Sequence, residues 1–463
     1  MKHKNMLLSA LLLIASTAAG YGQLGRQFPS ERRIVKDPRT GMDIIFLTSK
    51  SGMFDHKTYQ THSQWTADGK WCIFDSKNRA EGNAIAVNED SGEMIQVTEG
   101  GYTGKILISR KEMKMFFLRN QKDPKARRKG KTQTAEDPKN LTKEIVETDL
   151  AALFADSRAG KMKKAGHYER VVATIPPEYG IGGGDIALDA SERTVYFRTG
   201  REYAAQHLPE GTKIEPNFGP RHMGAGPTGI AAVNLETGAI TNVITVGFQI
   251  GHVQTNPWKP GEIIFCWETG GKAPQRTWMV QADGTGLQPI YEETKYDWVT
   301  HEAVIGRDEI AIAILGHRPM QPVNKDKFVY DAANPGQEPD WGPSGTRAKA
   351  TGLAVVNLRT HALSLEGQIP YGSGFWHVHG SADGHWVVGD NFRRELWLID
   401  RHTGERILLT AGHKETAQDH IHPTFSPDGT KINFQSAMLS EDGRSMNICV
   451  IRLPQSLLDR YKH

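Results

Sequence analysis

The sequence contains few cysteines, which argues against a fold held together by disulfide bonds. Only Cys72, Cys266 and Cys449 occur in 463 residues, and each lies in a short apolar run typical of a strand. An odd and sparse set does not form a disulfide framework, and the spacing matches no cysteine-type zinc motif. We therefore expect three buried thiols without a chemical role.

The sequence also lacks a strong excess of charge of either sign. It has 56 Lys and Arg against 53 Asp and Glu, a formal net charge of +3. Proteins that bind nucleic acid usually carry a broad basic surface, so we expect no nucleic-acid partner. The basic stretch at residues 122–131 is interpreted as a solvated loop, and an anionic substrate would have to be held by local groups.

Long hydrophobic runs are missing apart from residues 6–19. This run is short for a membrane span, follows Lys2 and Lys4, and precedes small residues at 20–22. That order predicts a signal peptide at residues 1–22 and export of the protein to the periplasm or the medium. No cysteine follows the predicted cleavage site, so a lipid anchor is not indicated, and we expect no integral membrane segment in the mature chain.

Glycine and proline are plentiful, with 48 and 23 residues, and many of them lie in turns that repeat. A turn followed by an apolar strand recurs along the chain, and a second motif of strand, Gly-containing turn and returning strand follows it. Gly adopts the positive φ of such hairpin turns at little cost. The clearest first turns are Thr-Ala-Asp-Gly at 66–69, Asp-Ala-Ser-Glu at 189–192, Ser-Ala-Asp-Gly at 381–384 and Ser-Pro-Asp-Gly at 426–429.

The length of the chain fits either two domains or one large repetitive domain, and the repeat favours the second. We count seven four-stranded units, which start near residues 56, 100, 184, 252, 301, 377 and 420. The fold class predicted is all-β, a single seven-bladed β-propeller over residues 23–463. Insertions are expected around 119–170, where 143–165 could add a short helix, and around 318–350, where they would frame a ligand cleft.

The last unit lacks an outer hairpin, and the N-terminal region supplies one without inner strands. Residues 33–49 contain two apolar runs around the turn Asp-Pro-Arg-Thr-Gly at 37–41. We therefore predict that this hairpin completes the C-terminal blade. Closing the ring in this way removes an exposed sheet edge.

Histidines recur near the innermost strand of five units, where side chains of a propeller face one axial channel. The histidines concerned are His56 with His62, His252, His301, His377 with His379, and His420 with His422. On a strand, residues i and i+2 point to the same side, so His420 and His422 could hold one ion. We predict a metal site at His301, His420 and His422, with an oxygen from Gln418; by ligand type, Mn, Zn, Fe or Ni would suit it.

Several motifs resemble the oligogalacturonate lyase family. They are Gly251-His252, Phe-Cys-Trp-Glu at 265–268 with Arg-Thr-Trp at 276–278, Thr-His-Glu at 300–302 and His-Ile-His-Pro-Thr-Phe at 420–425. His56 with Tyr59 and His377 also fit, and the similarity covers residues 33–453 with looser matching over 119–230. The resemblance implies a seven-bladed propeller that cleaves short α-1,4-galacturonides by β-elimination. It also implies that His252 is the base and that His301, His420 and His422 bind Mn²⁺, with Zn²⁺ or Ca²⁺ as alternatives.

The chain departs from the family pattern at three positions. Trp267 stands where the family has a histidine, and an arginine of the family falls near Gly229. The family glutamine lies three residues before the first histidine of the pair, whereas Gln418 lies two before His420. These departures concern the substrate more than the scaffold.

β-Elimination removes the C5 proton of a uronic acid and expels the group on O4. Because this proton becomes acidic only when the carboxylate is neutralised, a metal or an arginine must bind the carboxylate. We assign the base to His252, charge neutralisation to Arg276 or Arg221, and the leaving-group acid to Tyr59 or His56. His62, Trp376 and His377 are expected to contact the uronate oligosaccharide, and Trp267 and Trp298 to line the same channel.

Three other functions remain open at this point. One is a lyase for a different uronate linkage, such as a rhamnosyl-glucuronate or ulvan-like one. Another is a propeller that only binds a glycan or a protein, because propellers host many unrelated functions. A metal-dependent hydrolase is a third, although no close pair of carboxylates with an acid and base role stands out in the sequence.

Overall fold

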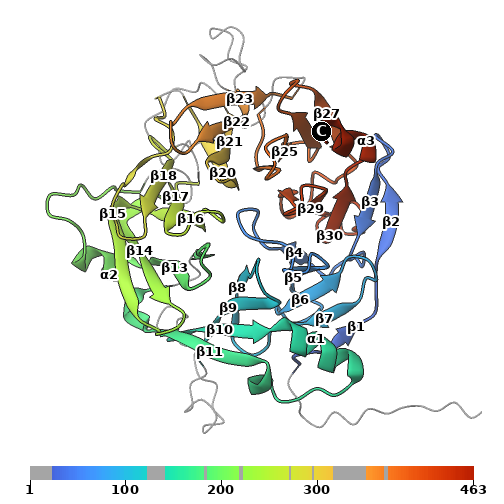
Figure 1. Cartoon of the computed structure of the whole chain (residues 1–463), viewed down its shortest axis with the longest axis horizontal. Coiled ribbons are helices and arrows are strands. Elements are labelled where there is room, and N and C mark those ends of the chain that lie inside the picture. Colours follow the sequence, from blue (N-terminus) through green and yellow to red (C-terminus); the bar gives the residue numbers. More distant parts are fainter. Residues whose placement is uncertain are drawn as a thin grey trace, which may run out of the picture.

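Seven antiparallel sheets form a ring around a central axis in the computed structural model of the chain (Figure 1). The structure describes residues 23–121, 141–181, 185–217, 223–270, 273–294, 297–315, 351–369 and 374–462. The prediction of an all-β, seven-bladed propeller is confirmed. The predicted signal peptide at 1–22, the basic stretch at 122–131 and the insertion at 318–350 lie outside the described residues.

Each sheet is one blade, whose strands follow one another from the axis to the rim. The first four blades are β4 (Asp55–Lys57), β5 (Trp71–Ser76), β6 (Ala84–Asn88) and β7 (Met94–Gln96); β8 (Tyr102–Ile108), β9 (Lys114–Asn120), β10 (Lys143–Asp149) and β11 (Glu169–Ile175); β12 (Ile186–Leu188), β13 (Thr194–Thr199), β14 (Ala225–Asn234) and β15 (Ile240–Phe248); and β16 (Ile250–Thr255), β17 (Glu262–Trp267), β18 (Thr277–Gln281) and β19 (Gln288–Pro289).

The fifth and sixth blades follow the same order. They are β20 (Val299–Gly306), β21 (Glu309–Leu315), β22 (Thr351–Asn357) and β23 (Leu363–Gly367), then β24 (Val378–Gly380), β25 (Trp386–Asp390), β26 (Leu396–Asp400) and β27 (Arg406–Thr410). The seventh blade begins with β28 (Thr424–Phe425), β29 (Lys431–Ser436) and β30 (Asn447–Arg452).

The N-terminal hairpin completes the seventh blade, as predicted. It consists of β2 (Arg33–Lys36) and β3 (Asp43–Phe46), and β3 pairs with β30 so that Ile45 lies opposite Val450 and Phe46 opposite Cys449. A further short strand, β1 (Gln27–Phe28), was not predicted and pairs with β7 at the rim of the first blade. The N-terminal region therefore joins the first and the last blade.

The helical segments are short and lie outside the blades. They are α1 (Leu150–Ala159), α2 (Arg201–Gln206) and α3 (Gln455–Leu458), with 3-10 turns at Ala165–His167, Pro177–Tyr179 and Asp459–Tyr461. Asp149 caps α1 by accepting a hydrogen bond from the Ala152 amide. None of the helices in the described part of the chain has the length and hydropathy needed to cross a membrane.

The predicted bounds of the insertion, 119–170, include residues that belong to strands of the second blade. Within it, β10 pairs with β9 along seven residues and continues into α1, while β11 begins at Glu169 and forms the rim of the second blade. The expected helix is present. The strands were missed because the basic stretch interrupts the alternating pattern that marks a hairpin.

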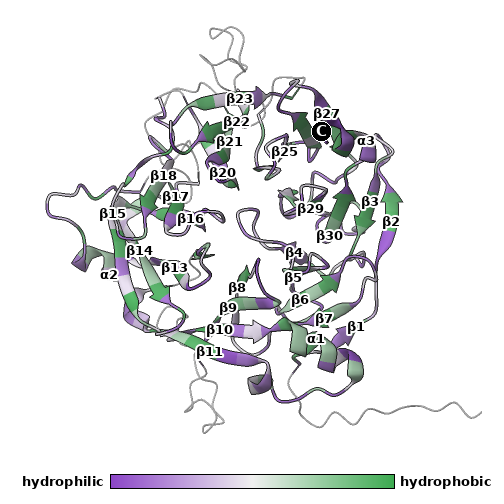
Figure 2. Ribbon diagram, in the orientation of Figure 1, coloured by the Kyte–Doolittle hydropathy of each residue, from purple (hydrophilic) through white to green (hydrophobic). Residues whose placement is uncertain are grey.

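The hydrophobic core lies between neighbouring blades, and many of the strands carry runs of hydrophobic residues (Figure 2). Between the seventh and first blades, for example, Leu47, Phe74, Ile85, Ile448 and Val450 form one buried cluster. Strands packed on both faces bury successive residues rather than alternate ones, which explains runs such as Ile-Ala-Ile-Ala-Ile-Leu at 310–315. The three cysteines are free and buried in this core, as expected.

The predicted turns hold the inner strand of a blade to the second strand. Gly69, Gly384 and Gly429 have φ between 67° and 79°, and in each turn the Asp side chain accepts a hydrogen bond from a Thr or Ser hydroxyl. These turns follow the inner strands, whereas the site histidines lie before those strands, as His377, His420 and His422 do, or at the third residue, as His252 and His301 do. The histidines of different blades are thereby collected at one end of the channel.

Candidate active site and metal centre

Histidines from four blades meet at the axis. The ring centroids of His301 and His377 are 4.2 Å apart, and those of His377 and His422 are 3.8 Å apart. His420 lies 5.2 Å from His377, and His252 lies 5.6 Å from His301. The structure thus brings together side chains that are up to 170 positions apart in the sequence (252 to 422).

Tyr59 enters the same group from the loop that follows β4. This loop reaches into the centre of the ring (Figure 1) and places the phenol ring 5.2 Å from His252 and 5.3 Å from His422, centroid to centroid. Burial and the neighbouring Glu302 carboxylate raise the pKa of Tyr59 well above its usual value. The phenol therefore stays protonated and can act as a proton donor.

His252 is held by carboxylates on both sides of its ring. Its Nδ1 lies 2.9 Å from Glu302 Oε1, and its Nε2 lies 3.2 Å from Glu268 Oε2. Burial favours the neutral ring, but Glu302 and Glu268 outweigh it and raise the pKa of His252. His252 also has a φ of 50°, a strained conformation that clusters at functional sites.

Arg276 lies beside His252 but is bound within the protein. It is 3 % exposed, with Nε at 3.3 Å from Glu302 Oε2 and Nη2 at 3.6 Å from Glu268 Oε2. Its charge is therefore already balanced by two carboxylates, which fits a structural role better than binding of the substrate carboxylate. Arg221, the other arginine predicted for this role, lies outside the described residues.

Asp390 joins the remaining histidines into a second group. The amides of His377 and Ile421 donate to its carboxylate at 2.7 and 3.0 Å, and Asp390 Oδ2 lies 3.2 Å from His377 Nδ1 and 3.5 Å from His420 Nδ1. Burial opposes ionisation of Asp390, but His377 and His420 hold its pKa well below the usual range. The donor atoms of His377, Asp390 and His420 all lie within 4.8 Å of one another.

The donors of this group fit a divalent metal ion. Burial lowers the pKa of His377 to about 3 and that of His301 well below its usual value, so both rings are neutral near pH 7. His301 Nδ1 and His420 Nδ1 are buried and have no hydrogen-bond partner among the described residues. Neutral imidazoles with free nitrogens beside a carboxylate suit Mn²⁺ or Zn²⁺.

The structure does not bring Gln418 into this group. Gln418 is exposed, whereas Asp419 Oδ1 lies 3.1 Å from His422 Nε2. Our expectation rested on a strand through the histidine pair, but β28 begins only at Thr424 and His422 has a φ of 54°. The left-handed residue turns the chain, so side-chain directions in this segment do not alternate as they would on a strand.

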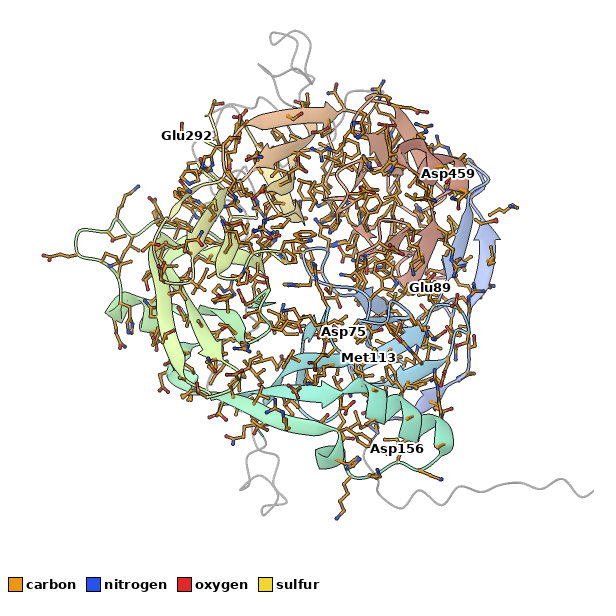
Figure 3. All side chains as sticks on the ribbon, viewed as in Figure 1. Asp75, Glu89, Met113, Asp156, Glu292 and Asp459 are labelled. Carbon is orange, nitrogen blue, oxygen red and sulfur yellow. The ribbon has the colours of Figure 1, made fainter. Side chains whose placement is uncertain are left out.

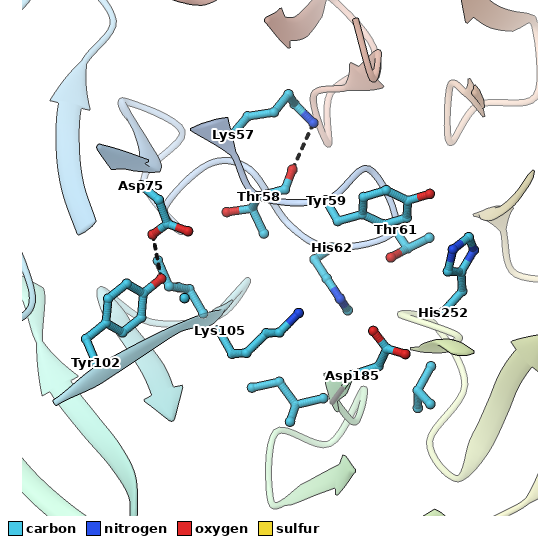
Figure 4. Close-up of a pocket in the computed structure, with 14 residues that line it drawn as sticks. Lys57, Thr58, Tyr59, Thr61, His62, Asp75, Tyr102, Lys105, Asp185 and His252 are labelled. Carbon is cyan, nitrogen blue, oxygen red and sulfur yellow. Dashed lines mark hydrogen bonds between the residues drawn. The ribbon is translucent and has the colours of Figure 1, made fainter. Parts of the chain in front are cut away.

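Two cavities flank His252, and both are lined by His252 and Asp185. One, of about 330 Å³, contains Tyr59 and His62 (Figure 4). The other, of about 400 Å³, contains Arg276, Trp298, His301 and Trp376. His62 and Trp376, both predicted to contact sugar, thus line different cavities beside the base. His377, also predicted to contact sugar, lies within the metal group. His56 lies on β4. Burial lowers its pKa, although the Asp419 carboxylate acts in the opposite direction.

Sequence reasoning missed several polar residues of the site. Arg198 lines the larger cavity, and its Nη1 donates to the Ile250 carbonyl at 2.8 Å. On β13 it pairs with Ile230, next to the position where the family pattern led us to expect an arginine at Gly229. The sequence did offer one signal that could have identified Arg198 and Asp390 as site residues. Each is a single charged residue near the end of an otherwise buried strand.

Arg394 is a further cation near the metal group. It has a φ of 58°, and its Nε and Nη1 are buried without a hydrogen-bond partner in the described part of the chain. Burial lowers its pKa, and the carboxylates of Asp390 and Asp419 act in the opposite direction. It therefore keeps unused donors near the carboxylates of Asp390 and Asp419.

Comparisons with known proteins identify the fold. No family model and no curated protein matches the sequence. An oligogalacturonate lyase solved in complex with manganese is 17 % identical, with a TM-score of 0.66, over 94 % of this chain and 99 % of the other. Oligogalacturonate lyase from Vibrio parahaemolyticus is 18 % identical, with a TM-score of 0.65 and the same coverage. The chain thus has the fold of these lyases, in agreement with the resemblance of its motifs.

Proposed function

We propose that the chain is a polysaccharide lyase that cleaves a uronic-acid-containing oligosaccharide of the oligogalacturonide type by metal-assisted β-elimination. The observation that carries the proposal is His252, which is paired with Glu302 and faces a cavity that also contains His301 and Trp376. The similarity of fold to oligogalacturonate lyases supports it.

His252 acts as the base. Both ring nitrogens face carboxylates, and Glu302 is the nearer one, at 2.9 Å against 3.2 Å for Glu268. We therefore assign the proton of the neutral ring to Nδ1, where Glu302 accepts it, and the lone pair to Nε2. Nε2 takes the C5 proton of the uronate. The electron pair of the C–H bond forms the C4=C5 double bond, and the C4–O4 bond breaks. Glu268, at 3.2 Å from Nε2, stabilises the imidazolium that forms.

The substrate carboxylate has to be neutralised before the proton becomes acidic. We assign this role to Arg198, because it lines the cavity of His252 and its contact with Asp185 Oδ2 is long, at 3.9 Å. Arg276 instead keeps the two glutamates in place. A divalent ion, for which Mn²⁺ is our first choice, would be held by His420 with His377 and the Asp390 carboxylate, and by His301 and His422 beside them, and would supply further positive charge.

Tyr59 completes the reaction by donating a proton to the departing O4. Its phenol is protonated and lies close to both His252 and His422, on the wall of the smaller cavity. His56 lines neither of the two cavities that flank His252, which makes it the weaker candidate for the acid.

Export remains part of the proposal. The basic, apolar and small-residue order of residues 1–22 would send the protein to the periplasm or the medium. N-terminal sequencing of the protein from a secreting host, beginning at Gln23 or close to it, would support this. An N-terminus at Met1 would contradict it.

The ultraviolet absorbance of a 4,5-unsaturated uronate tests the reaction directly. With Mn²⁺ present, the wild-type protein should release this product from trigalacturonate, and His252→Ala should lower kcat/KM at least about a thousandfold. His207→Ala, which changes an exposed histidine after α2, is the matched control. Saturated products would indicate a hydrolase, and binding without cleavage would indicate a binding module; either result would overturn the lyase.

A further inference from the structure

A cysteine thiol lies beside the base, in a cluster that shares no residue with the metal group around Asp390. A nitrogen of His252, the Sγ of Cys266 and a carboxylate oxygen of Glu302 all lie within 4.8 Å of one another. Cys266 and Glu302 are 0 % exposed. Sulfur, imidazole nitrogen and carboxylate oxygen are the donors that proteins use for zinc. These three residues therefore offer a second set of metal ligands.

The backbone of the fourth blade brings the thiol and the imidazole together. Gly251 pairs directly with Cys266, and Gln254 pairs with Ile264, so β16 has one residue more than β17 between these pairs. His252 lies in this interval with a φ of 50°. Bulges of this kind redirect side chains next to active sites. The thiol and the imidazole thus come from adjacent positions of two hydrogen-bonded strands, and the blade itself fixes their proximity.

The charges around His252 favour a bound cation. Glu302 and Glu268 carry two negative charges, and Arg276, which contacts both, carries one positive charge. Arg276 Nε lies 3.3 Å from Oε2 of Glu302, whereas Oε1 of the same carboxylate faces His252 Nδ1 at 2.9 Å. An ion between Nδ1 and Oε1 would therefore balance the remaining negative charge and leave the contact of Arg276 with Oε2 intact.

The sulfur ligand decides which ion this cluster prefers. A thiolate is a soft ligand that suits Zn²⁺, and Mn²⁺ stands lowest in the affinity order of these divalent ions. The group of His377, Asp390 and His420 contains no sulfur. Burial raises the pKa of the Cys266 thiol well above its usual value, so the metal-free protein keeps it protonated, but a coordinated ion displaces a thiol proton.

The donors are close enough for one zinc ion. Zinc bonds of about 2.0–2.3 Å place two tetrahedral donors about 3.3–3.6 Å apart. The donors of His252, Cys266 and Glu302, all within 4.8 Å of one another, would have to approach by no more than about 1.5 Å. His252 and Glu268 line the cavity of about 400 Å³, which gives an ion a route to the cluster.

We propose that Zn²⁺ binds to His252 Nδ1, Cys266 Sγ and Glu302 Oε1 and inhibits the protein by locking its base. The Cys266 thiol gives its proton to the solvent, and the proton of the neutral imidazole moves from Nδ1 to Nε2, which faces Glu268. No electrons are transferred. Nε2 then has no lone pair with which to take the C5 proton. The inhibition rests on the proposed lyase function, whereas the zinc site itself does not.

Inhibition tests the effect on the base. Zn²⁺ is added to the Mn²⁺-loaded protein with trigalacturonate, and each variant is compared with its own rate without zinc. A base held in the wrong tautomer should lower the kcat of the wild type about 10²- to 10⁴-fold at saturating zinc. Cys266→Ser, and Cys266→Ala as a second variant, should need at least about tenfold more zinc for half inhibition. Cys72→Ser, at a buried thiol of the first blade, is the matched control and should be inhibited like the wild type.

Two results would overturn the zinc site and leave the lyase standing. One is equal inhibition of the wild type and both Cys266 variants, which would place the inhibiting zinc in the group around Asp390. The other is a wild type that forms the unsaturated product at an unchanged rate in saturating zinc.

Cobalt absorption tests the site without catalysis. Co²⁺ replaces zinc in such sites, and a cobalt–thiolate bond gives a near-ultraviolet charge-transfer band that imidazole and carboxylate ligands do not give. We expect this band, and its loss on adding Zn²⁺, in the wild type, in Cys72→Ser and in His420→Ala, which changes only the other metal group. Both Cys266 variants should lack it. This pattern would support the zinc site even if no substrate were cleaved, and a wild type without the band would overturn it.

Discussion

His252 Nδ1 lies 2.9 Å from Glu302 Oε1, and the two residues come from the inner strands of neighbouring blades, β16 and β20. Glu302 is 0 % exposed and also contacts Arg276. The contact therefore fixes the orientation of the imidazole through the packing of two blades. It also explains how a base can be positioned in a channel whose walls are separate sheets.

Replacing Glu302 by glutamine tests the orientation of the base. The amide has nearly the same shape but can donate to Nδ1, so the ring can adopt the tautomer with its proton on Nε2 and lose its lone pair there. We expect kcat to fall about 10²- to 10⁴-fold with little change in KM. The control is Glu309→Gln, which changes another glutamate of the blade that contains Glu302. Glu309 pairs with Arg401 and lies outside the site. Unchanged kcat in Glu302→Gln would rule out the pairing as a catalytic device.

Substitution of His420 tests the metal centre without an activity assay. His420→Ala removes a buried nitrogen without a hydrogen-bond partner from the group around Asp390. After loading with Mn²⁺ and dialysis, elemental analysis should find at least about tenfold less metal than in the wild type. His385→Ala changes a histidine of a turn in the sixth blade and should keep the wild-type metal content. Equal metal in His420→Ala would place the ion elsewhere.

The propeller could be predicted because its signals are local. Asp-Gly turns at 66–69, 381–384 and 426–429 and the apolar strands after them form each blade independently of the others. The meeting of His252, His301 and His377 also follows, since a repeated position in each blade points to the same axis. The closing hairpin was predictable for a similar reason, as the last blade lacked the strands that the N-terminus supplies.

Other parts of the site depend on departures from regular backbone, which a pattern does not reveal. Lys105 lines a cavity beside His252 from an irregular stretch of β8, and His422 turns at positive φ, so Gln418 does not accompany it. Glu302 follows His301 on β20, and only the packed structure shows that both lie beside His252 of the neighbouring blade.

Asp75 gives the stability of the protein a defined pH dependence. Burial raises the pKa of Asp75 to about 6, although the hydrogen bond from Tyr102 acts in the opposite direction. In the unfolded chain an aspartate titrates near pH 4. Between about pH 4 and pH 6 the folded state therefore binds more protons than the unfolded state, and the contribution of Asp75 to stability is full below pH 4 and is lost as the pH rises through 6.

The variant Asp75→Asn isolates the contribution of this carboxyl group to stability. Asp75 lies near the centre of the ring (Figure 3). The free energy of unfolding of the variant minus that of the wild type should increase between pH 4 and pH 6, at up to about 1.4 kcal/mol per pH unit, and level off above. Urea unfolding at several pH values measures it. Asp156→Asn, on the outside of the ring in Figure 3, has its pKa lowered by Tyr168 and Lys163 and should not show a rise of this sign. A flat difference for Asp75→Asn would contradict the shift.

Closure of the ring by the N-terminal hairpin makes Phe46 a sensitive position. Phe46 is 0 % exposed and packs in the cluster that joins the sixth and seventh blades, while Ile34 of the same hairpin is 56 % exposed. Removing a buried phenyl ring leaves a cavity and costs about 3–5 kcal/mol, whereas an exposed isoleucine contributes little. Phe46→Ala should therefore lower the midpoint of thermal unfolding clearly, and Ile34→Ala should change it only slightly.

Because the hairpin is the rim of the last blade, Phe46→Ala should also speed proteolysis within residues 23–46 before the rest of the ring opens. Equal midpoints for the two variants would mean that the ring does not depend on this closure.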